Sequence, residues 1–135
     1  MTPRQIELVQ QTFALVKPIA DQAAALFYQR LFTLDPALRA LFTHDMKEQG
    51  AKLMTTLGVV VAGLGKAETI IPAVQALARK HVGYGVKAEH YPTVGAALLW
   101  TLEQGLGPAF TPEVKEAWAA AYGLLTSVMI AAAYG

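Results

Sequence analysis

His81 is the side chain of this sequence whose type and position best suit chemistry. It lies in the stretch ARKHVGYG at residues 78–85. At 100° per residue, it shares one apolar helix face with Leu77, whereas Arg79 points the opposite way. A histidine on such a face is either a core residue with one hydrogen bond or a metal ligand directed into an apolar cavity. The core histidine is the more common case, and this face alone leaves both interpretations open.

Gln49 and Tyr28 are two neutral donors that also lie on apolar faces. Gln49 begins the stripe that continues through Leu53, Leu57, Val60 and Leu64. It is either a solvated amide at the start of a helix or a donor that reaches into a pocket. Tyr28 is either a core aromatic residue bonded to a backbone carbonyl or an O–H donor to a ligand. Phe42 follows Leu41 where the chain turns, a pattern that is usually simple packing.

The composition excludes several other kinds of chemistry. The chain contains no cysteine, which excludes disulfides, thiolate catalysis, iron–sulfur clusters and covalent attachment of c-type haem. His44 and His90 are 46 residues apart and no H-E-x-x-H motif occurs, so no zinc site is predicted. The formal net charge of +1 argues against electrostatic binding of nucleic acid.

Helix-start signals indicate the elements that must position these residues. Thr2, Asp35 and Thr111 each precede a proline, the usual pairing of an N-cap with a first helical residue. No segment alternates at period two, so strands are not expected. The sequence predicts one all-α domain over residues 1–135, with helices over 3–16, 19–34, 36–42, 47–64, 69–83, 91–106 and 112–133.

The two ends of the chain bear on its location. The N-terminal stretch MTPRQIELVQ has neither the cationic start nor the apolar run of a signal peptide, so we expect a cytoplasmic protein. Residues Ala117 to Gly135 carry no charge over 19 residues, which is long enough to span a bilayer. Basic anchors are missing at both ends of this segment, and we therefore expect a buried helix and no membrane association.

Taken together, these stretches resemble a globin over essentially the whole chain. The similarity is carried by ALFYQRLF at 25–32, DPALRALF at 35–42, QGAKLM at 49–54, KHVGYGVKAEHYPTVG at 80–95 and AWAAAYG at 117–123. It is closest to bacterial single-domain haemoglobins and to the globin domain of flavohaemoglobins. The resemblance implies a globin fold of six or seven helices in a three-over-three arrangement round a haem pocket.

The resemblance also implies roles for particular residues. His81 would be the proximal ligand of a noncovalent haem b, and Ala24 and Gly50 would be the small residues where two helices cross closely. The distal ligand pocket would consist of Tyr28, Gln49 and Leu53. The implied haem-contacting residues are Phe42, Leu53, Leu77, His81, Val86, Tyr91 and Val94, with Tyr91 as a support for the proximal histidine.

General chemistry agrees with these implied roles. The second ring nitrogen of His81 should donate to a backbone carbonyl one turn back, near Leu77. Tyr28, whose ordinary pKa is about 10, and Gln49 can both donate to bound O₂. Two such bonds would slow O₂ release by about two decades or more. His44 or His90 could in principle reach the iron, although the resemblance places neither there.

Two departures from the flavohaemoglobin pattern affect the expected activity. The resemblance places Ala133 where those proteins carry a glutamate that polarises the proximal histidine. The sequence ends at Gly135 without a flavin reductase domain, so we expect any electrons to come from an external reductase. Both departures put peroxidase-like chemistry and fast turnover in doubt.

Three functions are compatible with these residues. The first is reversible binding of O₂, and of NO and CO, with slow release, for oxygen transport or scavenging. The alternative is a nitric oxide dioxygenase that uses an external reductase, in which Tyr28 and Gln49 would serve the reaction. The third is a haem-free helical interaction domain. The 54% hydrophobic composition fits a monomer or a weak dimer equally well.

Overall fold

The computed structural model describes residues 1–42, 45–83 and 85–134, with the backbone alone for Ala67. The described residues form six α-helices joined by short 3₁₀ segments, with no strand among them. The α-helices are α1 (Pro3–Val16), α2 (Ala20–Leu34), α3 (Met46–Ala62), α4 (Ala67–Gly83), α5 (His90–Leu106) and α6 (Pro112–Tyr134). The 3₁₀ segments are η1 (Lys17–Ile19), η2 (Pro36–Leu41), η3 (Leu64–Lys66) and η4 (Gly107–Ala109). The predicted all-α fold class is confirmed.

The helices begin at the caps that the sequence predicts. At α1, the Gln5 backbone N–H donates to the Thr2 hydroxyl at 3.1 Å, and the Thr2 N–H donates to the Gln5 side chain at 3.0 Å. The Asp35 carboxylate accepts from the Ala37 N–H at 3.2 Å and starts η2. The segment predicted as a helix over 36–42 is therefore helical, but it is a 3₁₀ turn that ends at Leu41.

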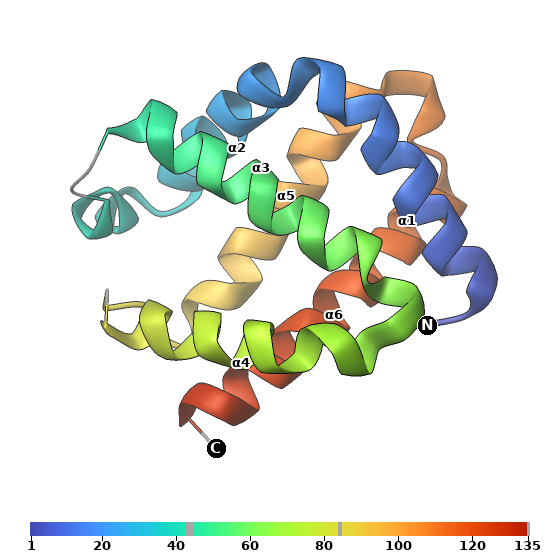
Figure 1. Ribbon diagram of the computed structural model, residues 1–135. Helices are drawn as coiled ribbons and strands as arrows, with labels where there is room; N and C mark the ends of the chain where they lie inside the picture. Colours follow the sequence, from blue (N-terminus) through green and yellow to red (C-terminus); the bar gives the residue numbers. More distant parts are fainter. Residues whose placement is uncertain (43–44, 84, 135) are drawn as a thin grey trace.

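The helices cross so that α3 and α4 form an open V (Figure 1). The two helices meet at η3 and then diverge, with the start of α3 and the end of α4 farthest apart. Helix α5 lies behind the V, and α6 passes behind α4. Gln49 lies near the open end on α3 and His81 near the open end on α4, so the two arms of the V carry the candidate residues.

Helices α2 and α3 cross at Ala24 and Gly50, where a close approach was expected. A Cβ atom at Gly50 would lie only 2.9 Å from the Cβ atom of Ala24. Real Cβ atoms do not come so close, so a side chain at residue 50 would push the two helices apart. This crossing holds the start of α3 against the middle of α2, which carries Tyr28.

Helix α6 is less buried than the sequence predicts. Its first half contributes Ala117, Trp118 and Ala121 to the core. Of its most apolar stretch of 18 residues, however, only 22% is buried. By length and composition alone this helix could cross a membrane, and core helices of globular proteins meet the same criterion. The expectation of a buried helix is therefore wrong for much of the second half, where Leu124 is 41% exposed.

Candidate functional site

His81 lies in the last two turns of α4 and is held by its own helix. Its Nδ1 atom is 2.8 Å from the carbonyl oxygen of Leu77, the hydrogen bond that was expected. Because a carbonyl only accepts, Nδ1 carries the proton and Nε2 carries the lone pair. Burial lowers the pKa of His81 from its ordinary value, and the bond to Leu77 opposes this shift. The imidazole is therefore neutral at pH 7, the form that coordinates metals.

Tyr28 and Gln49 form a pair on α2 and α3. Tyr28 is buried and its hydroxyl makes a side-chain hydrogen bond with Gln49. Burial raises the pKa of Tyr28, and the bond to Gln49 opposes that rise. The phenol thus stays protonated at neutral pH and can donate. Gln49 is half-buried and bonded to another side chain, so it is not simply a solvated residue at a helix start.

An aromatic cluster surrounds Tyr28. Its ring lies 5.3 Å from that of Phe42 and 6.0 Å from that of Phe32, measured between centroids. Phe32 and Phe42 are themselves 5.4 Å apart in an edge-on arrangement. These contacts restrict the Tyr28 ring to a narrow range of orientations. Phe42 comes from the turn after η2, so this short segment places an aromatic ring beside the predicted distal residues.

The apolar stripes of α3 and α4 face the same space. Val60 and Leu64 of the α3 stripe line a cavity together with Ile70 and Val74, which share the apolar α4 face of Leu77 and His81. The remaining members of the two stripes continue on the same faces towards the open end of the V. Leu53, Leu57 and Leu77 therefore flank the space between the diverging helices, and all three are only half-buried.

Val86 lies in the turn between α4 and α5, and Val94 lies on α5 after that turn. The Val86 N–H donates to the carbonyl of His81 at 3.0 Å, which joins the loop to the end of α4. Val94, on α5, packs against the main hydrophobic core. The turn thus holds Val86 at the end of the helix that carries His81.

Tyr91 is buried at the start of α5, packed with Val74, Ala78 and Met129. Within the described part of the chain its hydroxyl has no hydrogen-bond partner, so no bond to His81 supports the predicted role of a buttress. Ala133 packs beside the same cluster at the place where the resemblance puts a glutamate. The methyl group of Ala133 cannot accept a hydrogen bond from the Tyr91 hydroxyl.

The other two histidines are His90 and His44, and the structure describes only His90. His90 is the first residue of α5, and its Nδ1 atom accepts from the Lys87 backbone N–H at 3.0 Å. That contact fixes its ring locally, at the turn before α5. His44 lies outside the described residues. In the parts of the chain that the structure describes, no three His, Asp or Glu side chains gather as a metal cluster.

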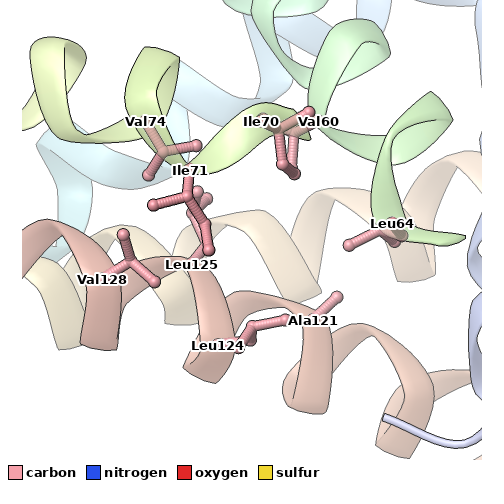
Figure 2. Close-up of a pocket in the computed structure, with 9 residues that line it drawn as sticks. All are labelled: Val60, Leu64, Ile70, Ile71, Val74, Ala121, Leu124, Leu125 and Val128. Atoms are coloured by element: carbon pink, nitrogen blue, oxygen red, sulfur yellow. The ribbon is translucent and has the colours of Figure 1, made fainter. Parts of the chain in front are cut away.

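Two cavities border the site without containing His81. The first, of about 40 Å³, lies between α3, α4 and α6 and is lined only by aliphatic side chains (Figure 2). The second, of about 400 Å³, lies on the outer side of the α2–α3 crossing, and its lining includes Tyr28, Phe32, Arg39 and Lys47.

Two tyrosines at the site carried no role in the sequence analysis. The Tyr122 hydroxyl donates to the Tyr91 carbonyl at 2.5 Å, and the Tyr134 hydroxyl donates to the Val86 carbonyl. Burial raises the pKa of Tyr122, with a further contribution from nearby Tyr91. Periodicity places both residues on an apolar helix, but only the packing of α6 against the α4–α5 turn shows which carbonyls they reach.

The sequence is similar to that of bacterial flavohaemoproteins. It is 33% identical over 133 residues to one from Rhodopirellula baltica and 35% identical over 133 residues to one from Bordetella parapertussis. Each alignment covers 96% of this chain and 33% of the relative. The chain therefore spans about a third of the length of these relatives.

The fold is similar to those of solved bacterial proteins. A globin from Campylobacter jejuni superposes with a TM-score of 0.85 at 27% identity, covering 97% of this chain and 95% of the other. An engineered carbene transferase, from a candidate nitric oxide dioxygenase of Rhodothermus marinus, superposes with a TM-score of 0.86 at 25% identity. That alignment covers 96% of this chain and 90% of the other. The sequence profile of the globins matches residues 25–129, and this chain belongs to the globin family.

Proposed function

We propose that this globin binds O₂, and also NO and CO, reversibly at a noncovalent haem b and releases O₂ slowly. Globins and flavohaemoproteins bind haem, and the family membership supports the same cofactor here. The observation that carries the proposal is the arrangement of a neutral His81 on α4 opposite the Tyr28–Gln49 pair of α2 and α3. A cytoplasmic location belongs to the same proposal.

The residues present fit a haem. Leu53, Leu57 and Leu77 are apolar yet half-buried on the facing sides of two diverging helices, which suits a flat apolar group held between them. His81 offers a neutral imidazole whose tautomer directs Nε2 as the coordinating atom. Phe42, Val86 and Val94 are the further residues that would hold the porphyrin. The chain has no cysteine for covalent attachment.

When bound, the haem iron would supply an open coordination position for a diatomic ligand. The chain's own residues then decide how long that ligand stays. The Tyr28 hydroxyl, protonated because burial raises its pKa, can donate to a bound ligand that carries partial negative charge. Gln49 orients that hydroxyl and can act as a second donor. The aromatic rings of Phe32 and Phe42 pack against the Tyr28 ring and hold its hydroxyl in place.

The proposal is tested first by the visible spectrum of protein expressed with sufficient haem. A Soret band that is lost in His81→Ala supports haem ligation by His81, whereas its absence from the wild type would reject haem binding altogether. The second step is stopped-flow O₂ release. Tyr28→Phe should release O₂ about 10- to 100-fold faster, since one charge-assisted bond is lost. CO release serves as the internal control because CO carries less negative charge. An unchanged O₂ rate would reject the donor role.

A nitric oxide dioxygenase is the second candidate, favoured by the structural similarity to the Rhodothermus marinus protein and by the flavohaemoprotein relatives. Conversion of NO and O₂ to nitrate requires one electron, which an external reductase would supply. Sustained NO consumption with a reductase and NADH, lost in Tyr28→Phe, would favour this enzyme. Consumption that stops after one equivalent would favour ligand binding alone. The haem-free interaction domain requires the absence of a Soret band.

A further inference from the structure

The exposed end of α4 carries positive charge that no nearby carboxylate balances. Between Glu68 and Glu89 the sequence contains Arg79, Lys80 and Lys87 and no Asp or Glu. All three cations are exposed, and the ion pairs found in the described part of the chain do not include them. Among the exposed Lys and Arg side chains of the described residues, only Arg79 and Lys80 have no carboxylate within four positions in the sequence.

The helix that packs against α4 does not supply the missing carboxylates. Residues 117–134 of α6 carry no charge, and this part of α6 lines the same cavity as α4. The acidic residues of α6, Glu113 and Glu116, lie near its start. The end of α4 and the loop after it therefore form a surface of net positive charge, which only Glu89 partly offsets.

The cations flank an exposed apolar side chain on the outer side of α4. Val82 is 43% exposed and follows Arg79 by three positions, so both lie on the same side of the helix. Arg79 lies almost opposite His81 round the helix axis. A Cβ atom at Gly83 would meet no described atom within 4 Å, so the surface is open to an approaching molecule. A protein bound here would be separated from the His81 side of α4 by one helix width, about 10–12 Å.

Charge distinguishes between the occupants that this surface could take. A second copy bound through the same face would bring like charges together, which is unfavourable. An acidic protein would be attracted to it and guided towards it during diffusion. Weak electron-transfer complexes bury little area, so a small apolar centre beside a charged rim is sufficient for one. A haem protein whose iron becomes ferric needs such an electron donor.

We propose that the α4 surface is the docking site of an acidic flavoprotein that donates one electron to the haem. The α4 surface consists of Arg79, Lys80, Val82 and Lys87. The cations attract the carboxylates of the partner, and Val82 provides the apolar contact. The reduced flavin of the partner loses one electron, and the ferric haem gains it and becomes ferrous. The electron transfer rests on the proposed function; the docking does not.

The first experiment measures docking without reference to haem chemistry. Calorimetric titration of the full chain with flavodoxin, an acidic flavoprotein, should give a dissociation constant that rises with salt concentration, because salt screens the attraction. Arg79→Gln/Lys80→Gln should bind about 3- to 30-fold more weakly. Lys52→Gln/Lys115→Gln is the matched control, since it removes the same charge from exposed positions on α3 and α6. The control should bind like the wild type.

The second experiment measures electron transfer into the ferric, haem-loaded protein by stopped flow. Reduction by photoreduced flavodoxin should be about 3- to 30-fold slower in Arg79→Gln/Lys80→Gln at low salt and unchanged in Lys52→Gln/Lys115→Gln. Photoreduced lumiflavin is small and uncharged, so it should reduce all three proteins at the same rate.

Each other outcome counts against a stated part of the proposal. Equal binding of flavodoxin by all three proteins would overturn the docking site, and so would binding of the α4 surface to phosphatidylglycerol vesicles in place of flavodoxin. A lowered thermal stability as the sole effect of Arg79→Gln/Lys80→Gln would assign both cations to the helix dipole instead. Weaker docking with unaltered reduction would overturn the role in electron transfer. A wild type without a Soret band would refute the proposed function, and the titration would still decide on docking.

Discussion

The packing of α6 differs between its two halves. In the first half, Trp118 is 3% exposed and its ring lies 6.3 Å from that of Phe13. Its indole N–H donates to the buried Thr12 hydroxyl at 2.8 Å, which in turn donates to the Leu8 carbonyl. In the second half, α6 meets α4 across a cavity, and the buried Tyr91 hydroxyl beside it has no partner in the described part of the chain.

This difference separates the part of the fold that the chain completes by itself from the part that faces the candidate site. The first half satisfies its buried polar groups and packs closely against α1, as stable cores do. The second half leaves apolar side chains of α3 and α4 half-exposed and one phenol unsatisfied. Regions that bind ligands are drawn from the less stable parts of a structure, and the α4 side of this protein has that character.

The largest expected effect comes from removing the centre of the well-packed half. Trp118→Ala should lower the free energy of unfolding by about 3–5 kcal/mol, because a large buried ring is replaced by a cavity. Trp100→Ala is the matched control, since Trp100 is only half-buried and lies against Arg30, and should cost clearly less. Urea denaturation of the two variants measures this. Equal losses would contradict the comparison between the regions.

The Trp118–Thr12 bond should matter because it is buried. Thr12→Val keeps the shape but leaves the indole N–H without an acceptor, at a cost of about 1–3 kcal/mol. Thr101→Val is the control. Thr101 is equally buried, but its hydroxyl donates only to the Ala97 carbonyl of its own helix, so no donor is orphaned. If thermal and urea unfolding showed the same loss for both variants, the indole bond would not be the cause.

Alkaline pH should destabilise the protein through its buried tyrosines, of which Tyr91 and Tyr122 lie on the α4 side. Burial raises the pKa values of Tyr91 and Tyr122 above 10, so the unfolded chain loses these protons first. The free energy of unfolding should therefore fall as pH rises above about 10, by up to about 1.4 kcal/mol per pH unit for each such tyrosine. Tyr122→Phe should reduce this slope by about one proton in urea titrations between pH 8 and 11. An unaltered slope would show that Tyr122 ionises freely in the folded protein.

The smallest expected effect is a gain from filling the cavity. Val128→Ile adds one carbon next to the aliphatic lining and should raise the free energy of unfolding by about 0.8 kcal/mol. Val59→Ile is the control, because Val59 is 55% exposed and the added carbon stays in water. Thermal unfolding compares the two variants. A loss of stability in Val128→Ile would mean that the cavity has the wrong shape for the added carbon.

Much of the fold and of the site's composition could be predicted from local sequence signals. The caps at Thr2 and Asp35 depend on residues within three positions, so short-range chemistry determines them. The His81–Leu77 bond is likewise local, spanning one helical turn. The close crossing at Ala24 and Gly50 was expected from the family resemblance and is present. The roles of His81, Tyr28 and Gln49 at a haem stay predictions.

Long-range contacts could not be predicted in the same way. The partner of the Trp118 indole is 106 residues away, and the carbonyl that accepts from Tyr134 is 48 residues away. Hydrophobic periodicity also overestimated the burial of α6, because it reports how apolar a helix is and not how much of it neighbouring helices cover.

The sequence by itself therefore determined where the helices begin, which faces are apolar and that a ring N–H of His81 has a carbonyl acceptor one turn back. These properties depend on backbone hydrogen bonding and side-chain type over a few residues. Only the tertiary structure decided that α3 and α4 diverge, that a cavity with an aliphatic lining lies between α3, α4 and α6, and that Tyr134 reaches the loop after His81. Those properties depend on the distances between whole helices. The packing of all the helices together determines these distances.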